Sequence, residues 1–209
     1  MNRWLLALVV AVLVWSGIAP FDRVTWWLEV TPVIVGIAVL LARWRKFPLT
    51  PLVTVLIAIH MIILAVGGHY TYALVPAGDW FRDWFHLSRN HYDRVGHLAQ
   101  GFVPAMITRE LFVRLDVFER RTWIPFLTVC VCLAISVVYE VIEWFSALWL
   151  GQGAEAFLGT QGDPWDTQTD MFLAGVGAVC ALAFLSRWHD RQMARLTTSR
   201  RACAESTPA

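Results

Sequence analysis

Residues 123–150 read WIPFLTVCVCLAISVVYEVIEWFSALWL, an apolar run that carries two glutamates, Glu140 and Glu143, and no lysine or arginine. A helix needs about 20 consecutive apolar residues to cross the hydrocarbon core of a bilayer, so this stretch is long enough to span a membrane. Other blocks of the chain are similarly apolar. The stretch therefore predicts an all-α membrane protein, and it raises the question of why two carboxylates lie within it.

The composition of the whole chain also indicates a membrane protein. Hydrophobic residues make up 57% of the 209 residues, charged residues only 16%, and the mean hydropathy is +0.54. Soluble domains carry about 25% charged residues. We therefore expect a single transmembrane domain over residues 1–196, an all-α polytopic helix bundle, followed by a disordered cytoplasmic tail over residues 197–209. About six transmembrane helices are predicted, over residues 3–19, 26–43, 51–68, 94–113, 122–150 and 167–188.

The first predicted span has a competing interpretation as a cleaved signal peptide. Its apolar stretch is long for the apolar region of a signal peptide, Pro20 would follow the cleavage site directly, and a second span begins at Trp26. These features favour a helix that is retained in the mature protein.

Basic residues set the expected orientation in the membrane. They gather at one set of span ends and in the tail, at Arg3, Arg43, Arg45, Lys46, Arg114, Arg120, Arg121, Arg187, Arg191, Arg195, Arg200 and Arg201. The positive-inside rule then places both termini of this multi-pass membrane protein in the cytoplasm. The net charge of +1 argues against a nucleic-acid partner. Membrane lipids are the expected partners, homo-oligomerisation is left open, and the substrate is unknown.

Acidic and imidazole side chains converge near the opposite span ends. Asp93 and His97 are four residues apart at the start of span 94–113, so both lie on one helix face. Asp166 and Asp170 have the same spacing at the start of span 167–188. Further along each span, the same face carries residues that allow close helix packing. These are Gly101 and Pro104 on span 94–113, and Ala174, Gly177 and Ala181 on span 167–188.

The cost of burying charge indicates that these residues have a purpose. A charge at the centre of a spanning helix costs roughly 2.5–3.5 kcal/mol on insertion scales. At this depth the carboxylates outnumber the available arginines, which are Arg82, Arg89 and Arg94. The excess negative charge calls for a metal ion or for protons.

A divalent metal site is the first interpretation of this group. Asp, Glu and His side chains suit Zn²⁺, Mn²⁺ or Mg²⁺, and a bound ion can activate water. We expect Asp93, His97, Asp166 and Asp170 to bind the metal, and Glu140 or Glu143 to act as general acid or base. The identity of the cofactor stays unknown.

Two other functions fit the same residues. A proton- or cation-coupled transporter would use the carboxylates as a relay, whereas a structural or accessory protein would use them only to fix helix packing. Asp166 also fits a helix N-cap, and whether the protein is an enzyme is left open. At the other span ends, Glu110 with Arg109 and Arg114 is expected to form an interfacial salt-bridge group, and His189 is expected to be solvated.

The motifs HYDRVGHLAQGFVPAMITRE, YEVIEW and FLGTQGDPWDTQTDM together resemble the YjdF-type family of bacterial inner membrane proteins. This resemblance extends over nearly the whole chain and implies six helices, but no activity, substrate or cofactor. A shorter likeness is to VanZ-like membrane proteins. It rests on the Asp93–His97 helix start, on Glu140–Glu143, and on Asp166–Asp170 followed by glycines, and it would imply a role at the cell envelope.

Overall fold

Helices form nearly all of the chain that the computed structural model describes, which is residues 3–150 and 160–205. No strand occurs among these residues, so the prediction of an all-α fold is confirmed. The helices are α1 (Arg3–Ser16), α2 (Arg23–Arg43), α3 (Pro51–Tyr70), α4 (Pro76–Phe85), α5 (Tyr92–Arg114), the 3-10 turn η1 (Arg121–Trp123), α6 (Ile124–Leu150) and α8 (Asp166–Glu205).

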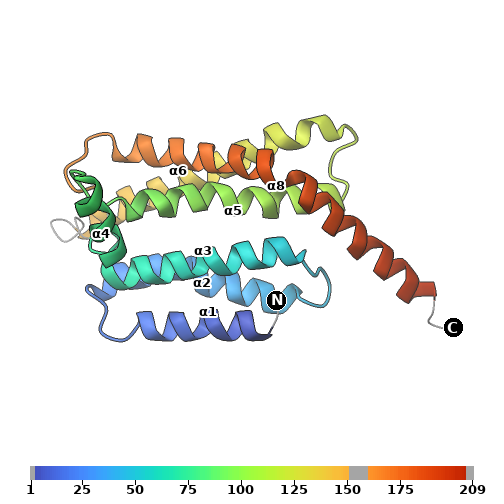
Figure 1. The fold of residues 1–209 in the computed structure, drawn as a ribbon, viewed down its shortest axis with the longest axis horizontal. Helices are drawn as coiled ribbons and strands as arrows, with labels where there is room; N and C mark the ends of the chain where they lie inside the picture. The colour runs from blue at the N-terminus through green and yellow to red at the C-terminus, as the bar shows by residue number, and fades with distance from the viewer. Residues whose placement is uncertain (1–2, 151–159, 206–209) are drawn as a thin grey trace.

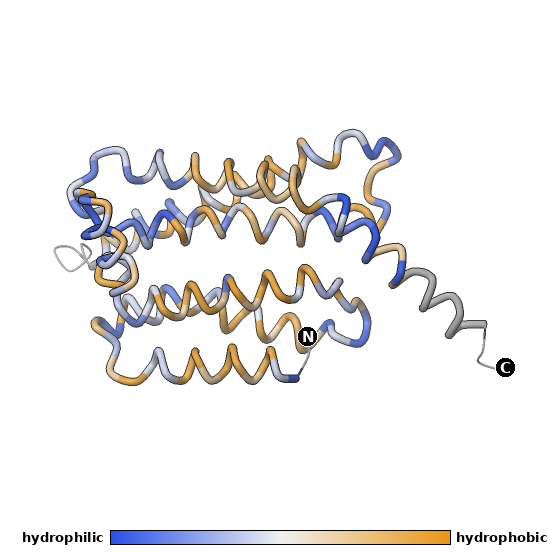
Figure 2. Tube along the Cα trace, viewed as in Figure 1, coloured by the Kyte–Doolittle hydropathy of each residue, from blue (hydrophilic) through white to orange (hydrophobic). Residues whose placement is uncertain are grey.

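A helix lies at the position of each of the six predicted spans. By length and apolar composition, four helical segments in the described part of the chain qualify as membrane spans: α2, α3, η1 with α6, and α8. The helix α1 is shorter, at 14 residues, and α5 carries the polar residues discussed above. Figure 2 shows hydrophobic residues along the middle of the helices and hydrophilic ones near their ends, as expected for a polytopic membrane bundle.

The bundle consists of two groups of three helices, α1–α2–α3 and α5–α6–α8, which meet where α3 packs against α5 (Figure 1). The start of α1 and the end of α8 lie at the same end of the bundle, here named the tail end. The opposite end is named the α4 end, because α4 lies across the other helices there (Figure 1). Trp80 and Trp84 of α4 are exposed, as aromatic residues at a membrane interface are.

The last helix is longer than predicted. The helix α8 continues to Glu205, whereas the predicted span ends at residue 188 and residues 197–209 are predicted to be disordered. No proline or glycine interrupts the chain between Trp188 and Glu205, and the segment is rich in alanine and arginine, which favour helix. Residues 206–209 lie outside the described part of the chain.

The closest helix pair, α5 and α8, is the one that positions the site. An added Cβ at Gly101 would overlap the backbone carbonyl of Ala174, and one at Gly177 would overlap the carbonyl of Leu98. The two backbones therefore approach one another more closely than any larger residue would permit. This contact brings the starts of α5 and α8 together at the α4 end.

A second polar group holds the tail end together. The predicted ion pair of Glu110 with Arg114 is present at 2.5 Å, whereas Arg109 pairs with Asp190. The Glu110 side chain is fully buried in the protein and also accepts a hydrogen bond from the backbone N–H of Thr50 at 3.0 Å. The His189 side chain is also fully buried, with Nε2 3.0 Å from Glu110, so the prediction of a solvated His189 is wrong. Glu110 thus joins α5 to the start of α3 and to α8.

Candidate metal centre

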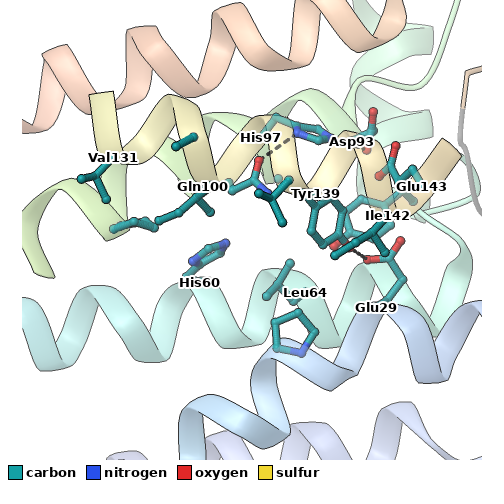
Figure 3. A pocket seen from close by; sticks show the side chains of 17 residues that line it. Glu29, His60, Leu64, Asp93, His97, Gln100, Val131, Tyr139, Ile142 and Glu143 are labelled. Atoms are coloured by element: carbon teal, nitrogen blue, oxygen red, sulfur yellow. Dashed lines mark hydrogen bonds and ion pairs between the residues drawn. The ribbon is translucent and has the colours of Figure 1, made fainter. Parts of the chain in front are cut away.

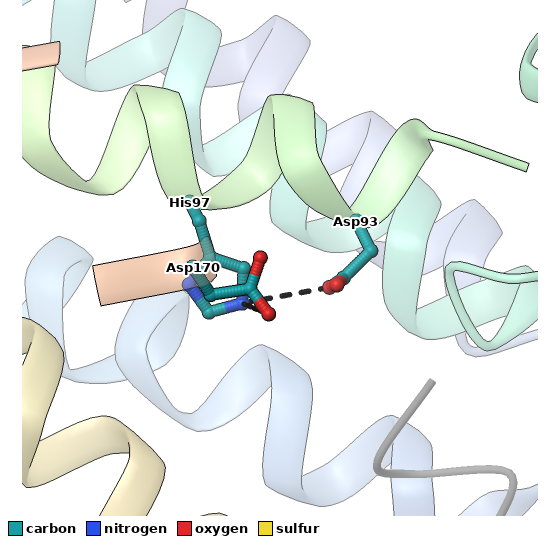
Figure 4. Close-up of side chains that lie close together, drawn as sticks. All are labelled: Asp93, His97 and Asp170. Atoms are coloured by element: carbon teal, nitrogen blue, oxygen red, sulfur yellow. Dashed lines mark ion pairs between the residues drawn. The ribbon is translucent and has the colours of Figure 1, made fainter. Parts of the chain in front are cut away.

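Three ligand-type side chains from two helices meet near the α4 end. Asp93 and His97 lie one turn apart in the first turns of α5, and Asp170 comes from the second turn of α8. His97 Nε2 lies 3.5 Å from Asp93 Oδ1 and 3.9 Å from Asp170 Oδ2. One ligand atom from each residue lies within 4.8 Å of the others (Figure 4). The i, i+4 spacing on α5 and the close α5–α8 packing together produce this group.

The group is buried and its hydrogen bonding is incomplete. Asp93 is 8% exposed, His97 5% and Asp170 3%. Asp93 Oδ2 and Asp170 Oδ1 have no hydrogen-bond partner among the residues that the structure describes. Buried polar atoms are nearly always hydrogen-bonded or bound to an ion or water, and a buried carboxylate without compensation is costly. The arrangement therefore leaves one oxygen of each carboxylate available to an ion or a water.

The spacing of these atoms suits a metal ion better than direct hydrogen bonds. A hydrogen bond between nitrogen and oxygen has a length of about 2.7–3.2 Å, which is shorter than both distances from His97 Nε2. Ligand atoms placed tetrahedrally about 2.1 Å from a metal lie about 3.4 Å from one another. The 3.5 Å distance from His97 Nε2 to Asp93 is close to this second value, and the 3.9 Å distance to Asp170 is longer.

The other side of the imidazole contacts a second layer of polar residues. His97 Nδ1 lies 3.1 Å from Gln100 Oε1 and 3.8 Å from Glu140 Oε1. When Nδ1 carries the proton, it donates to Gln100, and Nε2 keeps its lone pair toward Asp93 and Asp170. Metal-binding histidines are commonly oriented by such a hydrogen bond from the other ring nitrogen.

Asp166, the fourth predicted ligand, is paired with Arg89 and does not join the group formed by the other three. Its carboxylate accepts a hydrogen bond from Arg89 at 2.5 Å. The same guanidinium lies 3.3 Å from Asp163 and 4.0 Å from Asp93. Asp166 is the first residue of α8, one turn before Asp170, so it lies nearer the bundle end, where Arg89 precedes α5. Arg89 therefore links the start of α8 to the start of α5 beside the candidate metal centre.

A cavity of about 540 Å³ adjoins the group (Figure 3). Asp93 and His97 line it on one side, and Glu143 of α6 and Glu29 of α2 line it as well. The Tyr139 hydroxyl donates to Glu29 at 2.8 Å and so connects α6 to α2. Of the two predicted acid–base residues, Glu143 lines the cavity, whereas Glu140 is not among its lining residues and lies 3.8 Å from His97 Nδ1.

Glu29 belongs to this site but is absent from the predicted set. It is 3% exposed and is the only acidic residue between Trp26 and Arg43. That isolation in an apolar span is a signal that could have identified it, because an acidic residue inside a transmembrane segment is by default a functional candidate. Nothing in the sequence singles out Tyr139 in the same way, since tyrosines are common in membrane helices.

Comparison with known proteins identifies a family of membrane proteins. Residues 1–191 match the family described as "Predicted membrane protein (DUF2238)". The chain is also similar to "Inner membrane protein YjdF" of Escherichia coli (strain K12), with 54% identity over 184 residues that cover 88% of each protein. No solved structure matches the chain. The relative and the membrane-spanning helices support a multi-pass inner membrane location, and the resemblance to the YjdF-type family is confirmed. The chain belongs to the DUF2238 family of predicted membrane proteins.

Proposed function

We propose that this protein is an integral membrane enzyme that binds a divalent cation through Asp93, His97 and Asp170. The observation that carries the proposal is the convergence of three ligand atoms within 4.8 Å, with one carboxylate oxygen of Asp93 and one of Asp170 left without a hydrogen-bond partner among the described residues. Carboxylate and imidazole are ligand types that Zn²⁺ and Mn²⁺ both accept. Asp166 lies outside this set because Arg89 engages its carboxylate.

The proposed reaction class is hydrolysis or group transfer. A divalent cation held by three protein ligands keeps a position for water and lowers the pKa of that water toward neutrality. Glu143 lines the adjoining cavity and is the residue placed to exchange a proton with a substrate there. Glu140, 3.8 Å from His97, is placed to orient the imidazole rather than to touch a substrate.

The proposed site faces the outside of the cell. It lies at the α4 end, opposite the start of α1 and the end of α8 (Figure 1). The basic residues of the chain are concentrated toward the tail end, in the α2–α3 connection, the α5–α6 connection and the end of α8. The positive-inside rule therefore supports a cytoplasmic tail end and an external site.

Metal binding by the detergent-purified protein tests the proposal. We expect one ion per chain after equilibrium dialysis against Zn²⁺, Mn²⁺ or Mg²⁺ in turn, measured by elemental mass spectrometry. Saturating ion at about 100 times its Kd should raise the free energy of unfolding by about 2.7 kcal/mol. The Asp170→Asn variant should lose both effects.

The matched control is Asp190→Asn, because Asp190 is an ion-paired acid of α8 at the tail end, 2.7 Å from Arg109. This variant should bind metal as the wild type does. If the wild type binds none of the three ions, or if Asp170→Asn binds them as well as the wild type, the proposed function is wrong. In that case the group acts only in helix packing, and Asp170→Asn changes stability equally with and without ions.

A further inference from the structure

A cavity of about 720 Å³ lies between α2, α3 and α5, on the tail-end side of the candidate metal centre. Its wall on α2 runs from Pro32 to Arg43 and Trp44, the residues at the tail end of that helix. The rest of the lining is mainly aliphatic, and includes Val35, Val39, Ile57, Ile107 and Leu111. The cavity, here named the chain cavity, is therefore a hydrocarbon-lined space with a cationic side chain at its tail end.

The length of the chain cavity matches one leaflet of a bilayer. Arg43 follows Pro32 by eleven residues on α2, which corresponds to about 16 Å of helix at 1.5 Å per residue. One leaflet has a hydrocarbon layer of about 15 Å, half of the full core. An ordinary acyl chain whose head group lies at Arg43 therefore has the length to fill the cavity.

The chain cavity is open to the bilayer along one side. Val35 and Val39 on α2 line it, and each is 55% exposed. An acyl chain can therefore enter from the side, while its head group stays in the interfacial layer. This access suits a lipid of the surrounding membrane better than a water-soluble ligand.

A second, basic cavity of about 430 Å³ adjoins the chain cavity at the tail end. Leu40 and Trp44 line both. It lies between the start of α1 and the connection from α2 to α3, which meet at this end of the bundle (Figure 1). Its basic lining residues are Arg3, Arg45 and Lys46. Together with Arg43 of the chain cavity, four cationic side chains surround the head-group end.

This positive charge has no acidic counterpart in the linings. Among the residues that the structure describes, no aspartate or glutamate lines the chain cavity or the basic cavity. Glu110, the buried acid of the tail end, is bonded to Arg114 and His189 and lies outside both linings. The cavity at the α4 end, by contrast, is lined by three acidic residues and by no lysine or arginine. Charge complementarity therefore directs an anionic head group to the tail end.

We propose that the chain cavity and the basic cavity together bind one anionic phospholipid from the leaflet at the tail end. Its phosphate lies near Arg43 and Arg45, and one acyl chain extends along α2 toward Pro32. Basic pockets at the cytoplasmic side of membrane helices bind anionic head groups in this way. The chain itself gains little free energy, since lipid tails are as apolar as the cavity walls, so the head group supplies the selectivity. The proposal is independent of the metal centre, which lies at the other end of the bundle.

Native mass spectrometry of the detergent-purified protein tests the head-group part with two probes that have identical acyl chains. The probes are phosphatidylglycerol, which is anionic, and phosphatidylethanolamine, which is zwitterionic. We expect the wild type to bind phosphatidylglycerol about tenfold more tightly, a difference of about 1.4 kcal/mol. The double variant Arg43→Gln with Arg45→Gln should remove most of this preference.

The matched control is Arg120→Gln with Arg121→Gln. These two arginines are exposed and follow α5 at the same end of the bundle, but they line neither cavity. The control removes the same number of charges from the same membrane face and should keep the preference. Equal binding of the two lipids by the wild type would overturn the proposal, as would an equal loss of preference in both double variants.

A second pair of variants tests the position of the acyl chain. Val39→Trp narrows the chain cavity and should weaken the binding of both lipids, whereas Val179→Trp on α8 should not. Val179 is a suitable control because it is 54% exposed, as Val39 is at 55%, and lines neither cavity. Lipid binding by Val39→Trp that equals that of Val179→Trp would contradict the proposal. A change of oligomeric mass in Val39→Trp without a change in lipid binding would do the same, since this face would then join two copies of the chain.

Discussion

His97 is the residue at which the acidic groups of three helices meet. Its Nε2 atom faces Asp93 and Asp170, and its Nδ1 atom faces Gln100 and Glu140. An imidazole has one nitrogen on each side of the ring, so it can bind an ion on one side and be oriented by a hydrogen bond on the other. No carboxylate at this position would connect the two sides in the same way.

Asp163 is a carboxylate beside the site that is stabilised by hydrogen bonds and is not one of the proposed metal ligands. It accepts a hydrogen bond from the Trp165 N–H at 3.0 Å and another from Arg94 at 2.8 Å, and Arg89 lies 3.3 Å away. The Trp165 N–H and, to a smaller extent, the two guanidinium groups hold the pKa of Asp163 below its usual value. The charged carboxylate is therefore favoured in the folded protein.

The sign of the resulting pH dependence follows from this lowered pKa. The folded-state pKa lies below the unfolded value of about 3.9, so the stabilisation is present above about pH 4 and is lost as the pH falls through the folded pKa. The difference in unfolding temperature between wild type and Asp163→Asn should be positive near pH 7 and should shrink below about pH 4. Thermal unfolding in detergent across this range measures it.

A suitable control is Asp116→Asn at the tail end, since Asp116 is exposed and contacts Arg121 at 3.3 Å. Exposed pairs contribute about 0–1 kcal/mol, so this variant should differ little from the wild type at any pH. A stability difference for Asp163→Asn that grows as the pH falls would contradict the assignment.

At the scale of the helices, the contact between α5 and α8 determines whether the site can form. Gly101 and Gly177 each face backbone atoms of the partner helix rather than a side chain. Backbone cannot rotate away as a side chain can. The ligands from α5 and α8 therefore depend on two positions that accept only glycine.

Gly177→Ala should destabilise the protein, because the new methyl group would meet the Leu98 carbonyl and force the helices apart. Overpacking typically costs about 1–3 kcal/mol, and the separation should also weaken metal binding. Gly175→Ala is the matched control on the same helix, because its Cβ would meet only the end of the Leu133 side chain, at 3.3 Å. Unfolding in detergent compares the two variants, and equal stability of both would show that the close approach is not needed.

At the scale of the whole molecule, the two ends of the bundle have different polar groups. Within residues 3–150 and 160–205, the acidic group at the α4 end has oxygens without hydrogen-bond partners, whereas Glu110 at the tail end is bonded to Thr50, Arg114 and His189. A fully satisfied network stabilises packing, while an incompletely satisfied one leaves capacity for a ligand. This difference supports function at the α4 end and structure at the tail end.

The proposed orientation can be tested by reporter fusions. Green fluorescent protein fused after the last residue should fluoresce, because the tail end is expected in the cytoplasm. Alkaline phosphatase fused after Tyr70, at the end of α3, should be active, because that position is at the α4 end. Phosphatase activity at the C-terminus together with inactivity after Tyr70 would reverse the orientation, and the site would then face the cytoplasm.

The sequence by itself determined the fold class, the approximate helix positions and the faces that carry polar residues. Apolar blocks of spanning length can satisfy their backbone only as helices in a bilayer, and the i, i+4 spacing of Asp93 and His97 places both on one face of α5. The stripe of Ala174, Gly177 and Ala181 likewise indicated the packed face of α8, and its first two members contact α5.

Only the tertiary structure decided which of these side chains meet. Helical periodicity specifies directions within one helix, but the distance between side chains on different helices depends on how closely the helices pack and on their relative axial position. That geometry separates Asp166 from Asp170 and pairs Asp166 with Arg89. It also brings Glu29 to Tyr139 at the wall of the cavity beside His97 and buries His189 against Glu110. No spacing along the chain encodes these three contacts, because each joins residues at least 77 positions apart.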